Sequence, residues 1–344
     1  MAGKLASRVR GLSEAQFQEA FGTEEQCRAA VEKLRWPKGF VCPLCGGAEG
    51  KWLSTRPKVQ CRAVVEELRW PKGFVCPLCG GVEGKWLSTR PKIQCRACRH
   101  QASLTAGTIF HATKLPLTTW FLAMWLVATA KNGISSVELG RRLGIKQTHA
   151  WALKQKLTHV MAERDGAKRL DGRVEMDDAY LGGHRPGKRG RGAAGKRPFV
   201  AAVSTGDDRR PRKMKLLPVR GFRKREIKRL VGEHLASASR LVTDGLSRWT
   251  AAAEAGLAHT AMATGGGKRA AQWSPFKWVN TTLGNVKAAI TGTYRRVSPE
   301  HAGRYLASHA WRFNRRFQLD SLIPRLVHSA VRTAPLPYAK LVAG

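Results

Sequence analysis

The spacing of apolar residues divides the chain into a helical middle part and a longer part in which strands and helices alternate. Residues 118–131 are almost continuously apolar, which predicts a buried helix. From Arg173 to Leu181 apolar and polar residues alternate, which predicts a strand. The same patterns predict further helices over 13–21, 137–143, 147–161, 223–236, 276–291 and 299–313, and strands over 198–205, 214–219, 240–243 and 259–263. We therefore expect three parts, over residues 1–104, 105–168 and 169–335.

The two short helices of the middle part carry the signals of a helix-turn-helix. Ser135 or Ser136 can cap the first helix, and Gly144 suits the left-handed residue that ends it. Apolar side chains should pack the pair together, while polar and basic side chains face outward as in a recognition helix. The packing positions are Leu139, Leu143, Ile145, Ala150 and Leu153, and the outward positions are Lys146, Gln147, Thr148, His149 and Lys154. The pattern favours DNA contact over an ordinary helical hairpin between two domains.

Near the N-terminus one segment occurs twice in tandem, over residues 27–60 and 61–94. The copies differ only at positions 30/64, 33/67, 48/82 and 59/93. Their chemistry is nevertheless unequal, because the second copy continues through residues 95–100 into CRACRH, whereas the first continues into CRAV. Only the second copy can therefore complete a site with two pairs of cysteines.

The second copy has the spacing of a four-thiolate zinc ribbon. Cys76-x2-Cys79 is followed, after fifteen residues, by Cys95-x2-Cys98. Each pair offers two sulfurs to one ion, and the segment between the pairs can fold back as a hairpin to close the tetrahedron. Paired cysteines at this spacing favour zinc over free or disulfide-bonded thiols. We expect one structural Zn²⁺ ion on these four side chains.

The first copy offers an incomplete zinc site. It has Cys42, Cys45 and Cys61, but Val64 stands where the second copy has its fourth cysteine. A metal ion here would need a borrowed ligand, for which Cys27 is the nearest candidate. The alternative is a duplicated passenger that folds only in part, since so small a ribbon has little core without metal.

Charge and cysteine usage indicate a nucleic-acid partner and a reducing compartment. The 344 residues include 61 Lys and Arg against 24 Asp and Glu, a formal net charge of +37 that is spread from end to end. Such a field attracts polyanions, although a ribosomal-type basic protein has a similar charge. All eight cysteines precede residue 99, which fits metal ligands in the cytoplasm better than disulfides. We expect no membrane association, because the longest apolar run is too short to span a bilayer.

The α/β part contains a loop suited to a phosphate backbone. After the strand that ends at Leu181, residues 185–197 are rich in Gly, Lys and Arg. Its candidates for DNA contact are Lys188, Arg189 and Arg191. Because the loop connects two expected strands, it should lie at one end of a hairpin.

Two acids on strands are candidates for a catalytic metal site. Asp177 lies in the strand 173–181, and Asp244 follows the strand 240–243. Carboxylates brought together on neighbouring strands make an oxygen-rich site for Mg²⁺ or Mn²⁺, although a single Asp at a strand end is more often a turn or cap residue. Two such ions can bind the attacking and leaving oxygens of a phosphoryl displacement.

A third ligand is needed after Asp244. Asn280 offers an amide oxygen, which binds a hard cation more weakly than a carboxylate does. Lys287 lies seven residues further, about two helical turns, so both side chains share one face of a helix and the lysine can hold a phosphate. Glu254 is the only acid between Asp244 and Glu300 and is the alternative ligand.

The IS1595 family of transposases, of the ISXO2-like type, closely resembles this chain in four segments: VEMDDAYLGG, LVTDG, KWVNTTLGNVKAAITGTYRRVS and RYLASHAWRFNRRF. The cysteine ribbon, the TAGTIF segment and the helix-turn-helix are similar as well. The resemblance covers most of the chain after Trp70 and implies an RNase H-like catalytic domain, a mixed sheet flanked by helices. Its signature falls on Asp177, Asp244, Asn280 and Lys287, with Asp177 rather than Asp178 matching the family strand. The duplicated ribbon departs from the family.

The resemblance implies a DNA transposase in the bacterial cytoplasm, associated with the nucleoid. It implies binding to terminal inverted repeats and target DNA as a homo-oligomer. In the mechanism that the resemblance implies, metal-activated water would cut the element end, and the freed 3′-hydroxyl would attack the target. Asp177, Asp244 and Asn280 would hold the ions, and Lys287 would position phosphate. One alternative is a non-catalytic DNA-binding protein from a decayed or domesticated transposase, suggested by Asn280 in place of an acid and by the duplicated ribbon. Another is a nuclease without strand transfer.

Overall fold

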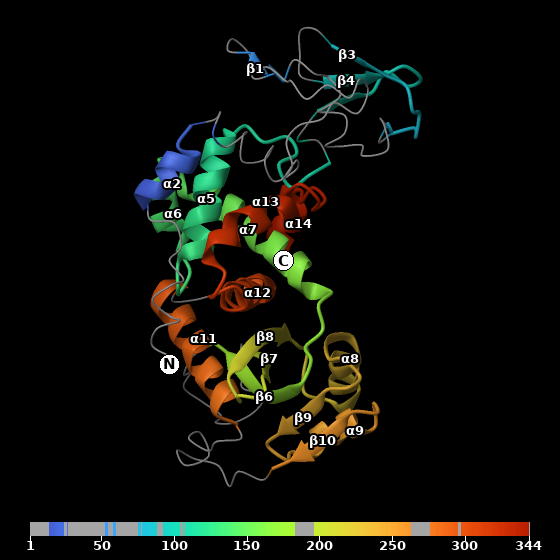
Figure 1. Ribbon diagram of the computed structural model, residues 1–344, viewed down its shortest axis with the longest axis vertical. Coiled ribbons are helices and arrows are strands. Elements are labelled where there is room, and N and C mark those ends of the chain that lie inside the picture. The colour runs from blue at the N-terminus through green and yellow to red at the C-terminus, as the bar shows by residue number, and fades with distance from the viewer. Residues whose placement is uncertain are drawn as a thin grey trace. The chain divides into compact units, whose positions relative to one another are not determined.

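The computed structural model describes residues 14–23, 26, 52–53, 58–59, 75–76, 78–87, 92–103, 105, 107–182, 196–262, 276–294 and 297–343. The described residues form two compact units. The sheet unit takes its residues from Ala123–Leu322 and Pro337–Gly344, and the ribbon unit takes its residues from Leu12–Leu122 and Ile323–Leu336. Figure 1 labels the elements of both units.

The ribbon unit contains a small antiparallel sheet after the expected N-terminal helix α2 (Glu14–Phe21). Its strands are β3 (Gly84–Trp86), β4 (Lys92–Cys95) and β5 (Gln101–Ser103), paired in that order. In the first copy, β1 (Trp52–Leu53) pairs with β2 (Lys58–Val59), with Trp52 opposite Val59. The second copy places Trp86 opposite Ile93 in the same way. Repeated sequence therefore gives the same hairpin register in both copies.

The boundaries between the units fall in α5 (Leu117–Thr129) and at the start of α13 (Leu322–Ala330). The apolar run that predicted α5 is buried along most of its length. Despite that run, no helix among the described residues is long and apolar enough to cross a membrane.

A five-stranded mixed sheet forms the centre of the sheet unit (Figure 1). Its order is β10-β9-β6-β7-β8, for β6 (Arg173–Leu181), β7 (Arg197–Thr205), β8 (Pro211–Pro218), β9 (Arg240–Thr243) and β10 (Ala258–Ala261). The first three strands along the chain pair antiparallel, whereas β9 pairs parallel to β6, and β10 parallel to β9. This mixed sheet, flanked by helices, has the RNase H-like architecture that the resemblance implies.

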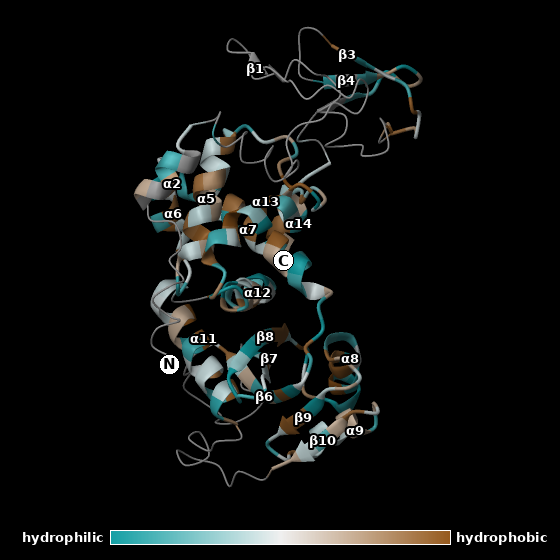
Figure 2. Ribbon diagram, in the orientation of Figure 1, coloured by the Kyte–Doolittle hydropathy of each residue, from teal (hydrophilic) through white to brown (hydrophobic). Residues whose placement is uncertain are grey.

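Alternating residues of β6 face two different cores. Val174 and Met176 join a core with α8 (Lys224–His234) and α9 (Thr250–Ala253), whereas Ala179 joins a core with α11 (Lys277–Tyr294) and α12 (Ala302–Phe313). Both faces of the sheet are thus covered, which explains why β7 is buried along most of its length. Figure 2 shows the result: β9 is mostly hydrophobic, and α8 carries both kinds of residue.

The helix-turn-helix forms as its sequence predicts. In α6 (Ser136–Leu143) the Ser135 hydroxyl accepts the Glu138 backbone N–H, and Gly144 ends the helix with a φ of 65°. A Cβ on Gly140 would meet the Ile145 carbonyl oxygen at 3.0 Å, so glycine there permits the close approach of the next helix. Four expected outward residues at the start of that helix are exposed: Lys146, Gln147, Thr148 and His149.

The expected outward position of Lys154 is wrong. The helix α7 (Gln147–Gly166) continues past its N-terminal turns and packs on α12, so its middle is buried on more than one side. Lys154 is only 2% exposed, with its Nζ 4.0 Å from the ring centroid of Tyr294 and 4.5 Å from that of Tyr305. Sequence periodicity placed this lysine on a free face because the neighbours that cover it are distant in the chain.

The end of α7 is tied to the sheet by charged groups. The Asp165 carboxylate accepts two hydrogen bonds from the Arg315 guanidinium, at 2.9 and 2.6 Å. From β8, the Lys215 Nζ donates to the backbone oxygens of Asp165 and Gly166, which stabilises the negative end of the helix. The helix-turn-helix and the sheet are therefore parts of one compact unit. The C-terminal helix α14 (Tyr338–Ala343) also contacts α7.

Candidate functional site

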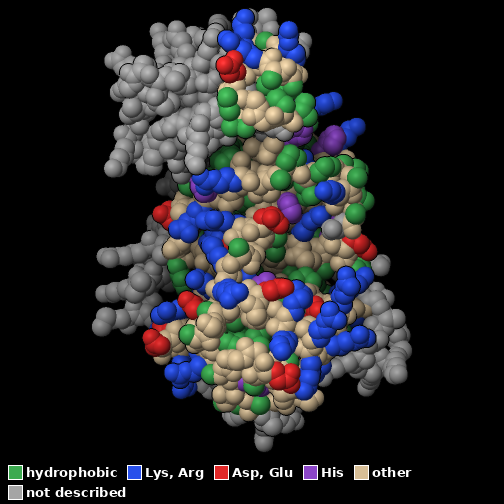
Figure 3. All heavy atoms as spheres, turned by 90° about the vertical axis from the view of Figure 1, so that its right-hand side faces the viewer, with side chains coloured by type: hydrophobic (Ala, Val, Ile, Leu, Met, Phe, Trp, Pro, Cys, Tyr) green, Lys and Arg blue, Asp and Glu red, His purple; other side chains and the backbone are tan. Residues whose placement is uncertain are grey.

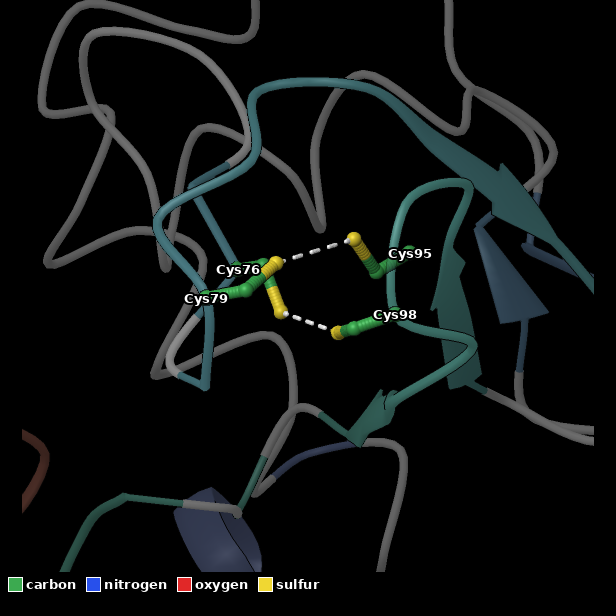
Figure 4. A group of neighbouring side chains, drawn as sticks. All are labelled: Cys76, Cys79, Cys95 and Cys98. Carbon is green, nitrogen blue, oxygen red and sulfur yellow. Dashed lines mark hydrogen bonds between the residues drawn. The ribbon is translucent and has the colours of Figure 1, made fainter.

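Four sulfur atoms of the second ribbon converge on one point (Figure 4). The Sγ atoms of Cys76 and Cys98 are 3.4 Å apart, and those of Cys79 and Cys95 are 3.7 Å apart. With Zn–S bonds of about 2.3 Å, a tetrahedral site has sulfurs about 3.8 Å apart. The observed spacing therefore fits a zinc ion coordinated by all four cysteines.

The backbone around the sulfurs is arranged by tight turns. The Cys76 backbone N–H donates to the Gly81 oxygen, and Gly80 has a φ of +74°. A Cβ on Gly81 would lie 3.3 Å from the Cys79 Sγ and 3.4 Å from the Cys95 Sγ. Glycine at this position therefore leaves room for the sulfurs to approach one another, which gives a physical reason for the CPLCGG sequence.

Several expected site residues lie outside the described part of the chain. They are the cysteines of the first ribbon copy, Cys42, Cys45 and Cys61, and the loop residues Lys188, Arg189 and Arg191. The incomplete zinc site and the basic loop therefore stay predictions.

Carboxylates from two strands meet in the sheet unit. Asp177 lies in β6, and Asp244 follows β9 directly. The two strands run parallel, with Glu175 opposite Val242, so both acids lie two residues further along the same direction. Carboxylate oxygens of Asp177, Asp178 and Asp244 all lie within 4.8 Å of one another. The topology thus brings together two acids that are 67 positions apart in the sequence.

Asp178 is the member of this cluster that sequence reasoning set aside. The family pattern matched Asp177, yet both neighbours reach the same place. The Arg248 guanidinium, in the short helix η1 (Ser247–Trp249), lies 3.6 Å from the Asp178 carboxylate, and both side chains are largely buried. A signal was present in the adjacent acids of VEMDDAYL, because two carboxylates inside one strand are costly without a charged partner.

Hydrogen bonds orient the carboxylates. Asp244 Oδ1 accepts from the indole N–H of the buried Trp249 at 2.8 Å and from the Leu246 backbone N–H at 3.3 Å. Asp177 Oδ1 accepts from the Asp178 backbone N–H at 2.7 Å. Each of the two acids therefore has one oxygen engaged and held in a defined direction, as a ligand site requires.

The cluster has the electrostatics of a cation site. The pKa of Asp177 is raised to about 7, chiefly by burial and also by the neighbouring carboxylates of Asp178 and Asp244, while the Asp178 N–H and the Lys287 ammonium act in the opposite direction. A divalent cation would remove this repulsion, and oxygen ligands are those that Mg²⁺ and Mn²⁺ prefer. The donor set therefore fits such an ion.

The helix α11 carries the other two expected site residues. Asn280 lies in its first turn and is half-buried, and Lys287 lies two turns later and is exposed. The positive charge of Lys287 lowers the pKa of Asp177 and so acts against the effect of burial. The alternative ligand Glu254 is exposed and pairs with Lys224 at 3.2 Å, so its carboxylate has a partner on α8 instead.

Comparison with known protein families shows which family the chain belongs to. The sequence model of the ISXO2-like transposase domain matches residues 169–314, which include all four signature residues and the whole five-stranded sheet. The model of the transposase zinc-ribbon domain matches twice, over residues 22–62 and 56–101. The chain belongs to the ISXO2-like transposases of the IS1595 family. No curated protein matches the chain at a significant level.

The two matches to the zinc-ribbon model differ in the same way as the two copies of the segment. The match over 22–62 ends before Val64, whereas the match over 56–101 extends past Cys98. Both copies are thus transposase zinc ribbons by sequence, and the second also has the four converging sulfurs. This combination supports a structural zinc ion in the second ribbon.

A transposase of this family binds DNA, and the charge of the surface is suited to that partner. Basic side chains outnumber acidic ones on the face drawn in Figure 3. Within the helix-turn-helix, Lys146 and its three successors are exposed, and the Gln147 side-chain amide donates to the Ser136 hydroxyl at 2.8 Å. Lys154 cannot contact DNA in this arrangement because it is buried.

Proposed function

We propose that this transposase cuts the phosphodiester backbone at the ends of an insertion sequence and joins the freed 3′ end to target DNA. The cluster of Asp177, Asp178 and Asp244 is the observation that carries the proposal. The three carboxylates concentrate negative charge in one place, and their mutual repulsion contributes to the raised pKa of Asp177. A metal-dependent reaction on a phosphodiester uses such a surplus of negative charge.

Each signature residue has a role in the proposed reaction. Asp177 and Asp244 offer carboxylate oxygens to the divalent cations, and Asn280 offers an amide oxygen from α11. Lys287 holds a phosphate of the DNA beside the acids. When bound, the cations lower the pKa of the attacking water and neutralise charge on the attacking and leaving oxygens. Asp178, paired with Arg248, is the second candidate for the third ligand, since its carboxylate lies in the cluster.

DNA recognition is assigned to other parts of the chain. The exposed N-terminal turn of α7, with Lys146, Gln147 and Thr148, is suited to the major groove. The ribbon is assigned to the terminal repeat. Because two element ends must be processed together, the proposed active species is a homo-oligomer on DNA.

A supercoiled plasmid that carries the gene with its flanking DNA tests the proposal. We expect nicking or excision at the element ends in Mg²⁺ and none in EDTA, and no reaction with Asp244→Asn. Joined products would then show strand transfer, whereas cleavage without joining would indicate a nuclease.

The duplicated ribbon favours a second candidate, a non-catalytic DNA-binding protein derived from a transposase. Specific binding to the element ends without any metal-dependent cleavage, by protein with an intact zinc site, would select this candidate and reject the first.

A further inference from the structure

A buried glutamate lies between the proposed catalytic strand and the helix α11. Glu175 is in β6, two residues before Asp177, so both side chains are on the same face of the sheet. Its side chain is 1% exposed. A carboxylate this deeply buried needs charged or hydrogen-bonding partners for each of its oxygens.

Both oxygens of Glu175 have such partners. Oε2 accepts the backbone N–H groups of Trp278 and Val279, at 2.9 and 3.0 Å. Oε1 accepts from the Arg173 guanidinium at 2.8 Å. The first backbone N–H groups of a helix have no acceptor within the helix, and a negative charge there also complements the helix dipole. Glu175 therefore caps the N-terminus of α11 from a neighbouring strand.

Glu175 is unsuited to be a metal ligand itself, because its two oxygens are occupied by three donors. Its contacts instead join two elements that carry the proposed site. Asp177 follows on the same strand, and Asn280 follows directly after Val279 in the capped turn. Val279 in that turn, and Leu283 and Val286 farther along α11, also pack in the core, so the helix has other contacts that keep it on the sheet.

We propose that Glu175 is a positioning residue for DNA cleavage: it fixes the first turn of α11 to β6, and so sets where Asn280 and Lys287 stand relative to Asp177. The proposal rests on the cleavage activity proposed above. The core contacts of α11 maintain the fold, and the Glu175 cap defines the position of its first turn. Loss of the cap should therefore affect the chemical step more than folding or DNA affinity.

The substitution Glu175→Gln tests this. The amide keeps the size of the side chain but has one acceptor oxygen, so its NH₂ group must face either Arg173 or the helix N–H groups, which are donors as well. In the plasmid assay we expect kcat to fall about 100-fold, as misplacement by about 1 Å can cause, with KM for DNA nearly unchanged. The matched control is Glu226→Gln, which also removes a carboxylate that pairs with an arginine, Arg229 at 2.8 Å, but lies on α8.

A double-mutant cycle separates positioning from general stability. Asn280→Ala should strongly reduce kcat in the native background but have little further effect in Glu175→Gln, because the released turn no longer presents Asn280 correctly. If Asn280→Ala reduced kcat by the same factor in both backgrounds, measured on folded protein, the proposal would be overturned. Wild-type kcat in Glu175→Gln would overturn it as well.

A second variant covers failure of Glu175→Gln to fold. Glu175→Asp retains the charge beside Arg173 but withdraws the carboxylate from α11 by one methylene group, and the same cycle with Asn280→Ala applies.

The proposed cleavage function and the proposed positioning role of Glu175 are rejected by different results. Cleavage by Asp177→Asn would reject the proposed function, whereas an inactive Asp177→Asn beside fully active Glu175 variants would reject only the positioning role.

Discussion

The sulfur cluster and the carboxylate cluster are two candidate metal sites that the chain builds in opposite ways. All four sulfurs come from one continuous segment, between Cys76 and Cys98. The carboxylates come from two strands whose residues Asp177 and Asp244 are far apart in sequence and meet through parallel pairing. A local site can be recognised from spacing alone, whereas a site of the second kind becomes visible only when the order of strands is known.

The surroundings of the two clusters differ as well. Cys79 is exposed, and the ribbon sheet has short strands, so little apolar surface is buried without the metal. The carboxylates instead lie at the edge of two extensive hydrophobic cores that surround the five-stranded sheet. We therefore expect the first metal to maintain a fold and the second to support a reaction. The predictions below test this contrast, beginning with the largest effect.

Zinc loss should unfold the second ribbon. Cys98→Ser removes one of four thiolates, and the binding free energy of a structural zinc, about 10 kcal/mol or more, is largely folding free energy for so small a domain. We expect zinc content, measured with a colorimetric chelator, to fall by about one ion per chain. Cys45→Ser in the first copy is the control and should change it much less. Equal zinc loss from both variants would contradict the unequal roles of the copies.

Loss of a catalytic carboxylate should abolish the reaction but not the fold. Asp244→Asn keeps the size of the side chain and removes its charge, so we expect cleavage to fall about 1000-fold or more while thermal unfolding of the sheet unit is nearly unchanged. Binding to element ends, measured by gel shift, should be equal or slightly tighter because a negative charge is gone. A destabilised protein with the same loss would instead assign Asp244 a structural role.

The third ligand can be identified by paired substitutions. We expect Asn280→Ala to lose most of the Mg²⁺-dependent cleavage and Asn280→Asp to retain part of it, since a carboxylate also coordinates the ion. Asp178→Asn should cost less, about tenfold, because Arg248 already neutralises that carboxylate in part. The reverse order of effects would make Asp178 the ligand, and Glu254→Gln serves as the remote control.

The raised pKa of Asp177 should make metal-free protein less stable as pH rises. The pKa of about 7 in the folded protein exceeds the ordinary value of 3.8, so the folded state binds the proton more tightly. The stabilising contribution is present below about pH 3.8 and is lost as pH rises through about 7. In EDTA, the free energy of unfolding measured with urea should fall between pH 5 and 8. In Asp177→Asn this pH dependence should be weaker. Added Mg²⁺ should restore stability at pH 8 in native protein only.

The smallest expected effect concerns two lysines of α7. Lys146 is exposed at its start, and Lys154 is buried between two tyrosines. Lys146→Ala should weaken DNA binding and lower the salt dependence of log K by about 1, whereas Lys154→Met should leave that slope unchanged. A changed slope in Lys154→Met would show that this side chain reaches the DNA after all.

Local sequence signals were sufficient for several elements and for the sulfur site. Ser135 and Gly144 predicted the limits of α6, alternation predicted β6, and cysteine spacing predicted the four converging sulfurs. These features depend on backbone preferences and on ligands within one short segment, so the residues that cause them are close together in the chain.

Other features were decided by tertiary structure. The sequence contains Asp178, Glu175 and Lys154, and the adjacent acids of the strand gave a signal for Asp178, but the local pattern does not identify the partner of a cluster carboxylate, of a helix cap supplied by a strand, or of a buried cation. Each depends on a partner that is distant along the chain: Asp244, the first turn of α11, and the rings of Tyr294 and Tyr305. Such contacts form only when strand order and helix packing bring these segments together, which local periodicity does not specify.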